Sequence, residues 1–142
     1  MDPETGADIL LVEDNPDDVE FTLRTLKKAG LGDRVRVART GLEALDYLFG
    51  TGPQKGIPPE TLPRLVLLDL RLPGATGLRI LQWIRAESST RDLPVAILTA
   101  FDNDPDVVEI YKLGVIQYFK KPLELTELRS LAARIGLQSS LT

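Results

Sequence analysis

The sequence predicts an α/β fold in which a doubly wound, five-stranded parallel sheet is flanked by five helices. The first observation is three short runs made only of Ile, Leu, Val and Ala, at residues 9–12, 65–68 and 95–98. Continuous apolar strands are expected where helices cover both faces of a parallel sheet. The second observation is that a helical pattern follows each strand, as right-handed crossovers between parallel strands require.

Two shorter segments complete the predicted sheet. Residues 34–38 and 117–120 mix apolar with polar or charged side chains. We expect them to form strands that are less buried than the other three. The predicted number of strands is therefore five.

The first helix has a signal at each end. Asn15 is a good N-cap, Pro16 suits the first helical position, and Gly30 ends the pattern. Acidic residues follow the proline and two lysines precede the glycine, as the helix dipole favours.

Similar signals predict the other four helices. They are Thr40 with Glu43 as a capping box, residues 78–86, Asp104-Pro105 as a start with Gly114 as the stop, and residues 123–135. The apolar positions of the helical patterns are Val19, Leu23, Leu26, Leu42, Leu45, Leu48, Val107, Ile110, Tyr111, Leu125, Leu128, Ala132 and Ile135. Residues 50–63, with three glycines and four prolines, predict an exposed loop before the third strand.

The chain of 142 residues has the size of one ordinary domain. We expect residues 1–7 to be a flexible N-terminus, residues 8–135 to form the domain, and residues 136–142 to be a C-terminal tail. Because the sequence ends at Thr142, we expect no DNA-binding output module.

The composition excludes several classes of function. The sequence has no cysteine and no histidine, which excludes disulfides, thiolate chemistry, His-based zinc sites and Ser–His or Cys–His nucleophiles. A net charge of −4 argues against a general nucleic-acid binder. No apolar stretch approaches the roughly 20 residues that a bilayer requires, and the acidic N-terminus is unlike a signal peptide. We therefore expect a cytoplasmic protein without nucleic-acid or membrane partners.

Polar groups that can handle a phosphate or a metal stand where four of the apolar runs end. They are Glu13-Asp14, Asp69, Thr99 and Lys121, and parallel strands deliver such residues to one edge of the sheet. Three converging carboxylates repel one another, and an oxygen-only cluster suits Mg²⁺. One carboxylate would attack phosphorus and become an acyl phosphate, the others would hold the ion, and Thr99 and Lys121 would contact the phosphoryl oxygens.

Taken singly, each of these residues also has an ordinary structural explanation. Asp69 could begin a turn, Glu13-Asp14 could precede a helix, and Thr99 could simply end a strand. Lys121 could be an exposed base, and Tyr118 a core aromatic residue. We assign Trp83 and Phe101 to packing. The combination of positions favours the phosphoryl site.

The same positions resemble the receiver domain of two-component response regulators. The acidic pair after the first strand, the aspartate after the third, Thr99-Ala100 after the fourth and Lys121-Pro122 after the fifth occur in that order, and Pro73-Gly74 and Gly77 add to the match. The resemblance covers residues 8–135.

The resemblance implies a role for each matched residue. Asp69 would be the phosphoacceptor, supplied by a histidine kinase or a small phosphodonor. The Mg²⁺ ligands would be Glu13, Asp14, Asp69 and the backbone carbonyl of Arg71.

The resemblance also implies roles around the phosphoryl group. Thr99 and Lys121 would contact this group, and Tyr118 would rotate inward as the switch. The Lys121-Pro122 peptide bond would be cis. The protein would be no enzyme beyond its own phosphorylation and dephosphorylation.

The proline-rich loop and Asn15-Pro16 resemble a single-domain subgroup that partners bacterial phytochrome kinases. The implied partners are a sensor histidine kinase and an unidentified downstream protein that contacts the fourth helix, fifth strand and fifth helix. For this subgroup we also consider a homodimer through the fourth and fifth helices.

Two positions depart from the usual pattern of the family. Arg71 and Phe101 are bulky and flank the path of a hydrolytic water, so we expect autodephosphorylation to be slower than in Arg71→Asn or Phe101→Glu.

Rival functions remain open at this point. A phosphohydrolase with an aspartyl phosphate would usually carry a second aspartate where Arg71 stands. A flavodoxin-like flavin or nucleotide binder would need a phosphate-binding loop after the first strand, where Glu13-Asp14 stand instead. The domain could also be a phosphate sink or relay, or an interaction module independent of phosphorylation.

Overall fold

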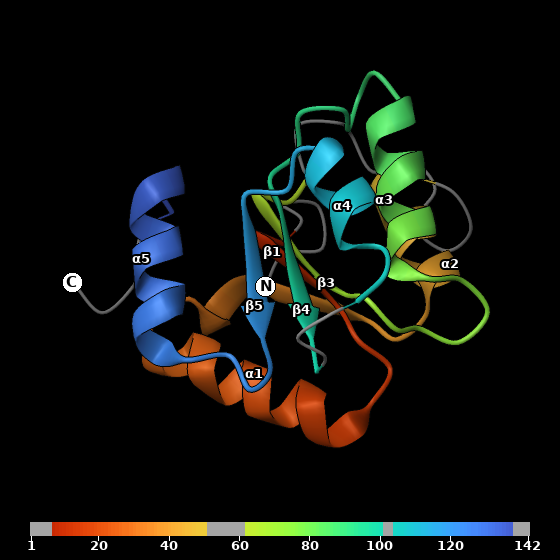
Figure 1. Cartoon of the computed structure of the whole chain (residues 1–142). Helices are drawn as coiled ribbons and strands as arrows, with labels where there is room; N and C mark the ends of the chain where they lie inside the picture. The colour runs from red at the N-terminus through yellow and green to blue at the C-terminus, as the bar shows by residue number, and fades with distance from the viewer. Residues whose placement is uncertain (1–6, 51–61, 101–103, 138–142) are drawn as a thin grey trace.

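The computed structural model describes residues 7–50, 62–100 and 104–137. Within these residues, five strands alternate with five α-helices, and one 3₁₀ turn precedes the second strand (Figure 1). The elements are β1 (Ile9–Val12), α1 (Pro16–Lys28), η2 (Gly32–Arg34), β2 (Val35–Ala38), α2 (Gly41–Phe49), β3 (Leu65–Asp69), α3 (Gly77–Ala86), β4 (Val95–Thr99), α4 (Val107–Lys112), β5 (Gln117–Lys120) and α5 (Leu125–Ile135).

The strands form one sheet in the order β2-β1-β3-β4-β5, and every neighbouring pair is parallel. The chain moves outward to one edge after β1 and to the other edge after β3. The order therefore reverses between β1 and β3, which lie side by side. In open α/β sheets the carboxyl ends of the strands at such a reversal form the ligand crevice.

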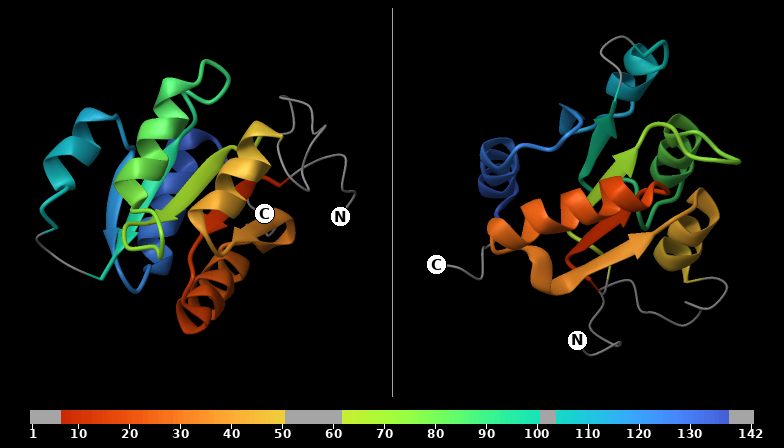
Figure 2. Two further views of the ribbon diagram at one scale, coloured as in Figure 1. Left: turned by 90° about the vertical axis from the view of Figure 1, so that its right-hand side faces the viewer. Right: turned by 90° about the horizontal axis from the view of Figure 1, so that it is seen from below.

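Helices cover both faces of the sheet (Figures 1 and 2). Alternate residues of each strand enter opposite cores, as the two-residue period of a strand requires. One core joins the sheet to α2, α3 and α4, and the other joins it to α1 and α5. All residues of β1, β3 and β4 are buried, whereas β2 and β5 are mostly half-buried. The predicted fold class and strand burial are confirmed.

Some predicted details of the helices are wrong. α4 begins at Val107 because the carboxylate of Asp104 accepts a bond from the Asp106 amide and forms a turn first. Leu42 and Tyr111, which lie at apolar positions of the helical patterns, are 69% and 56% exposed. Trp83 is also exposed and lies against the guanidinium of Arg79 rather than in a core.

Gly77 allows α3 to begin against the end of β3. A β-carbon at this position would lie 2.6 Å from the carbonyl oxygen of Asp69 and 2.8 Å from the α-carbon of Leu70. The Gly77 amide donates to the Leu70 carbonyl at 2.9 Å, so the backbones touch directly. The absence of a side chain is therefore what lets the connection after Asp69 fold back so closely.

Candidate functional site

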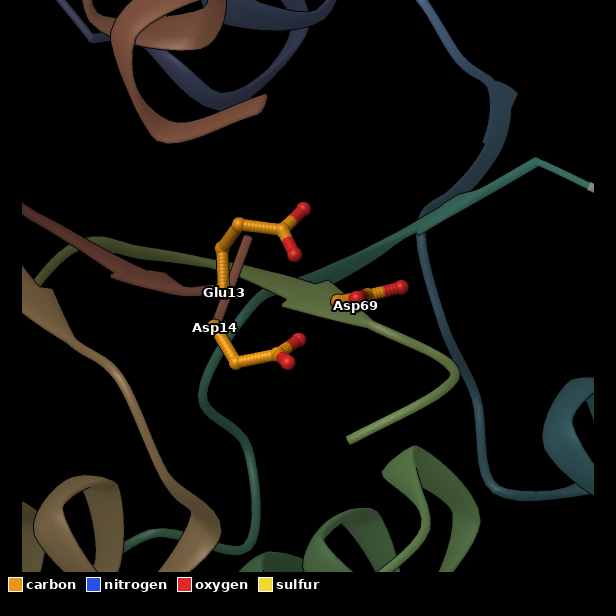
Figure 3. A group of neighbouring side chains, drawn as sticks. All are labelled: Glu13, Asp14 and Asp69. Atoms are coloured by element: carbon orange, nitrogen blue, oxygen red, sulfur yellow. The ribbon is translucent and has the colours of Figure 1, made fainter. Parts of the chain in front are cut away.

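Three carboxylates meet at the carboxyl ends of the neighbouring strands β1 and β3 (Figure 3). Glu13 and Asp14 follow β1, and Asp69 is the last residue of β3. One oxygen from each carboxylate lies within 4.8 Å of the others. Glu13 and Asp69 are buried, while Asp14 is exposed at the mouth of the site. The predicted convergence of these residues is therefore what the structure shows.

The amino end of α1 borders this cluster. The side chain of Asn15 accepts bonds from the amides of Asp17 and Asp18, as expected for its role as N-cap. The Asn15 amide in turn donates to Glu13 at 3.3 Å. These contacts fix the turn between β1 and α1, and they bring the Asp18 carboxylate toward the strand ends.

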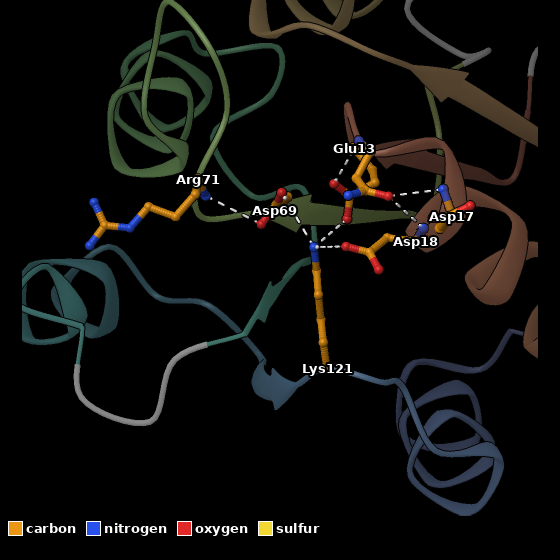
Figure 4. Close-up of polar contacts among 7 residues, drawn as sticks. Glu13, Asp17, Asp18, Asp69, Arg71 and Lys121 are labelled. Carbon is orange, nitrogen blue, oxygen red and sulfur yellow. Dashed lines mark hydrogen bonds and ion pairs between the residues drawn. The ribbon is translucent and has the colours of Figure 1, made fainter.

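Lys121 follows the edge strand β5, and its side chain reaches into the same site (Figure 4). Its ammonium group contacts Glu13, Asp18 at 2.9 Å and Asp69 at 3.4 Å. The backbone amide of Lys121 donates to the Thr99 carbonyl at 2.6 Å, and the following bond to Pro122 is cis, as the family resemblance implied. One lysine thus supplies the positive charge shared by three acidic side chains.

Burial and crowding change the affinities of these groups for protons. Burial raises the pKa of Glu13 from 4.5 to about 7, and the neighbouring Asp69 adds to the effect while Lys121 opposes it. The pKa of Lys121 is raised to about 12: burial lowers it, but the hydrogen bonds to Glu13 and Asp18 outweigh that effect. Ionising Glu13 is thus unfavourable here, chiefly because its carboxylate is buried.

Arg71, two residues after Asp69, contacts Asp69 through its backbone and a different residue through its side chain. Its amide donates to the Asp69 carboxylate at 3.2 Å. Its guanidinium extends away from Asp69 (Figure 4) and forms an ion pair of 2.6 Å with Asp104. The side chain of Asp104 is fully buried, whereas that of Arg71 is 48% exposed.

Thr99 and Tyr118 lie on the neighbouring strands β4 and β5. Thr99 is buried at the end of β4, and Tyr118 is half-buried on β5 with its ring stacked on Tyr111 at 6.0 Å. Burial raises the pKa of Tyr118, and Thr99 lies near enough to oppose this. Among the described residues, the buried Tyr118 hydroxyl has no hydrogen-bond partner. Phe101 lies outside the described residues.

The donor set of the cluster suits a hard divalent cation. Carboxylate and carbonyl oxygens are the ligands that Mg²⁺ prefers, and the strand ends place three carboxylates together. Burial and the neighbouring Asp69 carboxylate raise the pKa of Glu13, and a bound cation would oppose both effects. The carboxylates of Glu13, Asp14 and Asp69 therefore fit a divalent cation.

Two acidic residues of this region were not recognised from the sequence as part of the site. Asp18 and Asp104 were assigned only to helix starts, yet one contacts Lys121 and the other holds Arg71. For Asp18 a signal was available, since the first turn of a helix that begins at a strand end must lie beside that edge of the sheet. For Asp104 the sequence holds no such signal, because the contact depends on the path of two loops.

Comparison with known proteins gives the family. The sequence profile described as "Response regulator receiver domain" matches residues 9–133. The chain therefore belongs to the response regulator receiver domain family.

Individual relatives agree with this assignment. The chain is 37% identical to "Probable methanogenesis regulatory protein FilR2" of Methanothrix harundinacea, covering 91% of this chain and 81% of that protein. It is 34% identical to "Response regulator Rcp1" of Synechocystis, covering 84% and 80%.

Solved structures of relatives share the fold. The "Bacteriophytochrome response regulator RtBRR" is 40% identical with a TM-score of 0.81, covering 94% of this chain and 80% of that one. A structure titled as the Mn²⁺-bound form of response regulator Rcp1 is 33% identical with a TM-score of 0.72, covering 89% of each chain. Within the described residues, no helix is both long and apolar enough to cross a membrane.

Proposed function

We propose that this chain is a phosphorylation-dependent signalling switch, which accepts a phosphoryl group on Asp69 from a sensor histidine kinase in a Mg²⁺-dependent reaction. The observation that carries the proposal is the meeting of Asp69 with Glu13, Asp14 and Lys121 at the reversal of strand order. Membership of the receiver family supports it.

In the proposed reaction, a carboxylate oxygen of Asp69 attacks the phosphorus of the donor's phosphohistidine. The new O–P bond forms as the P–N bond breaks, and the imidazole leaves with the bonding electrons, so that Asp69 becomes an acyl phosphate. Glu13, Asp14, Asp69 and the backbone carbonyl of Arg71 would hold Mg²⁺. When bound, Mg²⁺ would neutralise the carboxylates and the charge that gathers on the phosphoryl oxygens.

Lys121 and Thr99 would receive the transferred group. The Lys121 ammonium already lies 3.4 Å from Asp69, so it needs only a small shift to pair with a phosphoryl oxygen. The Thr99 hydroxyl would donate to another oxygen. Because this would draw Thr99 toward Asp69, the nearby Tyr118 side chain would move into the space released, and the position of Tyr118 would report the phosphorylated state.

The face formed by α4, β5 and α5 would carry the signal to a downstream protein. On α4 the apolar side chains of Val108 and Tyr111 are 59% and 56% exposed, and Tyr111 stacks on Tyr118. A partner would shift the switch only by its difference in affinity for the two states. The same face would serve for a homodimer, which sedimentation at increasing protein concentration tests.

The kinase partner would be a cytoplasmic histidine kinase of the phytochrome type. RtBRR is named a bacteriophytochrome response regulator, and its similarity covers nearly the whole of this chain. The similarity of this chain to RtBRR supports a phytochrome-type kinase as the partner.

The test is the intact mass of the protein after incubation with Mg²⁺ and acetyl phosphate. We expect one phosphoryl adduct in the wild type and none in Asp69→Asn or with a chelator present. An adduct that persists in Asp69→Asn would overturn the assignment of the acceptor. A different outcome is a wild type that is folded and binds Mg²⁺ yet forms no adduct with acetyl phosphate or with a phosphorylated kinase as donor. That result would favour an interaction module independent of phosphorylation.

A further inference from the structure

The ion pair between Arg71 and Asp104 links the connection after β3, which begins beside the acidic site, to the turn before α4. Arg71 lies in the connection after β3, and Asp104 lies between β4 and α4. One oxygen of Asp104 is 2.6 Å from the Arg71 guanidinium, and the other accepts from the Asp106 amide at 2.8 Å. Since the Asp104 side chain is fully buried, removing its partner cation would leave a buried carboxylate without compensation.

The direction of the Arg71 side chain matters because of what lies on its other side. The Arg71 amide is 3.2 Å from the Asp69 carboxylate, so the residue begins next to three carboxylates and one partly compensating lysine. Without the ion pair to Asp104, the guanidinium would be attracted to that cluster, because opposite charges favour each other strongly at a partly buried site. The long arginine side chain could fold back over Asp69.

We propose that Asp104 is a positioning residue, which holds the Arg71 guanidinium away from the acidic cluster so that the cluster stays open to Mg²⁺. Without Asp104, the Arg71 side chain would turn toward Asp69 and Asp14 and compete with the ion as an internal cation. The inference rests on the proposed function, because it assigns Mg²⁺ to this cluster. It concerns a residue that contacts neither the ion nor the acceptor.

The test is the affinity for Mg²⁺, measured by calorimetry on the unphosphorylated protein with four variants. An opposite charge near a carboxylate changes its proton affinity about tenfold or more, so we expect Asp104→Asn to bind Mg²⁺ about tenfold more weakly than the wild type. The exposed Asp33, before β2, gives a matched control. Asp33→Asn removes the same charge and should change the affinity by less than twofold.

The double variant Arg71→Gln/Asp104→Asn separates positioning from loop damage. If Arg71 competes with Mg²⁺, the double variant should regain the Mg²⁺ affinity that Asp104→Asn loses. Arg71→Gln alone should bind Mg²⁺ no more weakly than the double variant. If Asp104→Asn and the double variant lose the same Mg²⁺ affinity, damage to the loop and not Arg71 causes the loss, and the inference is overturned. Unchanged affinity in Asp104→Asn would also overturn it.

A thermal melt of each variant shows that it is folded at the temperature of the titration. The inference and the proposed function fail in different ways. A wild type that does not bind Mg²⁺ contradicts the proposed function itself. A wild type that binds Mg²⁺ together with an Asp104→Asn variant of equal affinity contradicts only the role of Asp104.

Discussion

The ammonium group of Lys121 contacts the buried carboxylate of Glu13, with 2.5 Å between Nζ and Oε1. The two residues are 108 positions apart in sequence and come from the ends of β1 and β5, on opposite sides of β3 and β4 in the sheet. Lys121 therefore spans the crevice and places its ammonium group among the carboxylates of Glu13, Asp18 and Asp69.

Replacing Lys121 by Met should destabilise the magnesium-free protein. The change leaves the buried carboxylates of Glu13 and Asp69 without their counter-charge, and breaking a buried pair in this way costs about 3 kcal/mol. Urea unfolding with and without Mg²⁺ measures the effect. We expect the loss to be smaller with Mg²⁺, because the ion replaces the missing positive charge. An equal loss in both buffers would argue against Mg²⁺ binding beside Lys121.

The raised pKa of Glu13 predicts how stability depends on pH. Because the folded state holds this proton more tightly than the unfolded chain, the stabilising contribution is fully present below about pH 4.5 and is lost as pH rises through 7. Glu13→Gln cannot ionise, so in magnesium-free buffer its stability relative to the wild type should improve between pH 5 and 8. A wild-type minus Glu13→Gln difference that stays constant over this range would contradict the shift.

The affinity for Mg²⁺ should increase as Glu13 loses its proton, whereas the stability of the magnesium-free protein decreases. Mg²⁺ competes with the proton on Glu13, so the affinity should rise between pH 6 and pH 8 and level off above that. Calorimetry in buffers of different ionisation enthalpy would also detect proton release on binding near pH 7. If no proton is released, Glu13 is already ionised before the ion arrives.

The contact at Gly77 predicts a local cost for any side chain there. Gly77→Ala places a β-carbon 2.6 Å from the carbonyl oxygen of Asp69, and overpacking of this kind costs about 1–3 kcal/mol. Since the clash displaces the backbone of the acceptor itself, the rate of phosphorylation by acetyl phosphate should fall as well. A variant as stable and as rapidly phosphorylated as the wild type would show that α3 shifts freely.

The hydroxyl of Tyr118 should contribute little to the resting state. It is buried without a hydrogen-bond partner among the described residues, so Tyr118→Phe should leave stability unchanged or raise it by about 1 kcal/mol. Chemical denaturation measures the difference. A loss greater than about 1 kcal/mol would mean that the hydroxyl is bonded before phosphorylation, and would weaken the role of Tyr118 as a switch.

The sequence was sufficient to predict the fold and the three carboxylates. Continuous apolar strands imply a sheet covered on both faces, and parallel strands bring Glu13, Asp14 and Asp69 to one edge whatever the details of packing. The role of Asn15 as N-cap was also predictable, since capping is a local property of the chain. These features depend on short segments and on simple topology.

Other features depend on how distant segments pack, and the sequence could not show them. Helical periodicity identified an apolar pattern that includes Leu42 but not what covers each position, and Leu42 is exposed. The ion pair between Arg71 and Asp104 needs two loops to approach each other. The late start of α4 arose because Asp104 bonds the Asp106 amide in a turn, a choice that local propensity does not determine.

The most direct test of the account is to locate the phosphoryl group. The wild-type protein would be phosphorylated with acetyl phosphate and Mg²⁺, reduced with borohydride, digested and sequenced by mass spectrometry. Borohydride converts an aspartyl phosphate into homoserine, so the account predicts homoserine at position 69 and unmodified aspartate at position 14. Homoserine at any other position, with Asp69 unmodified, would contradict it.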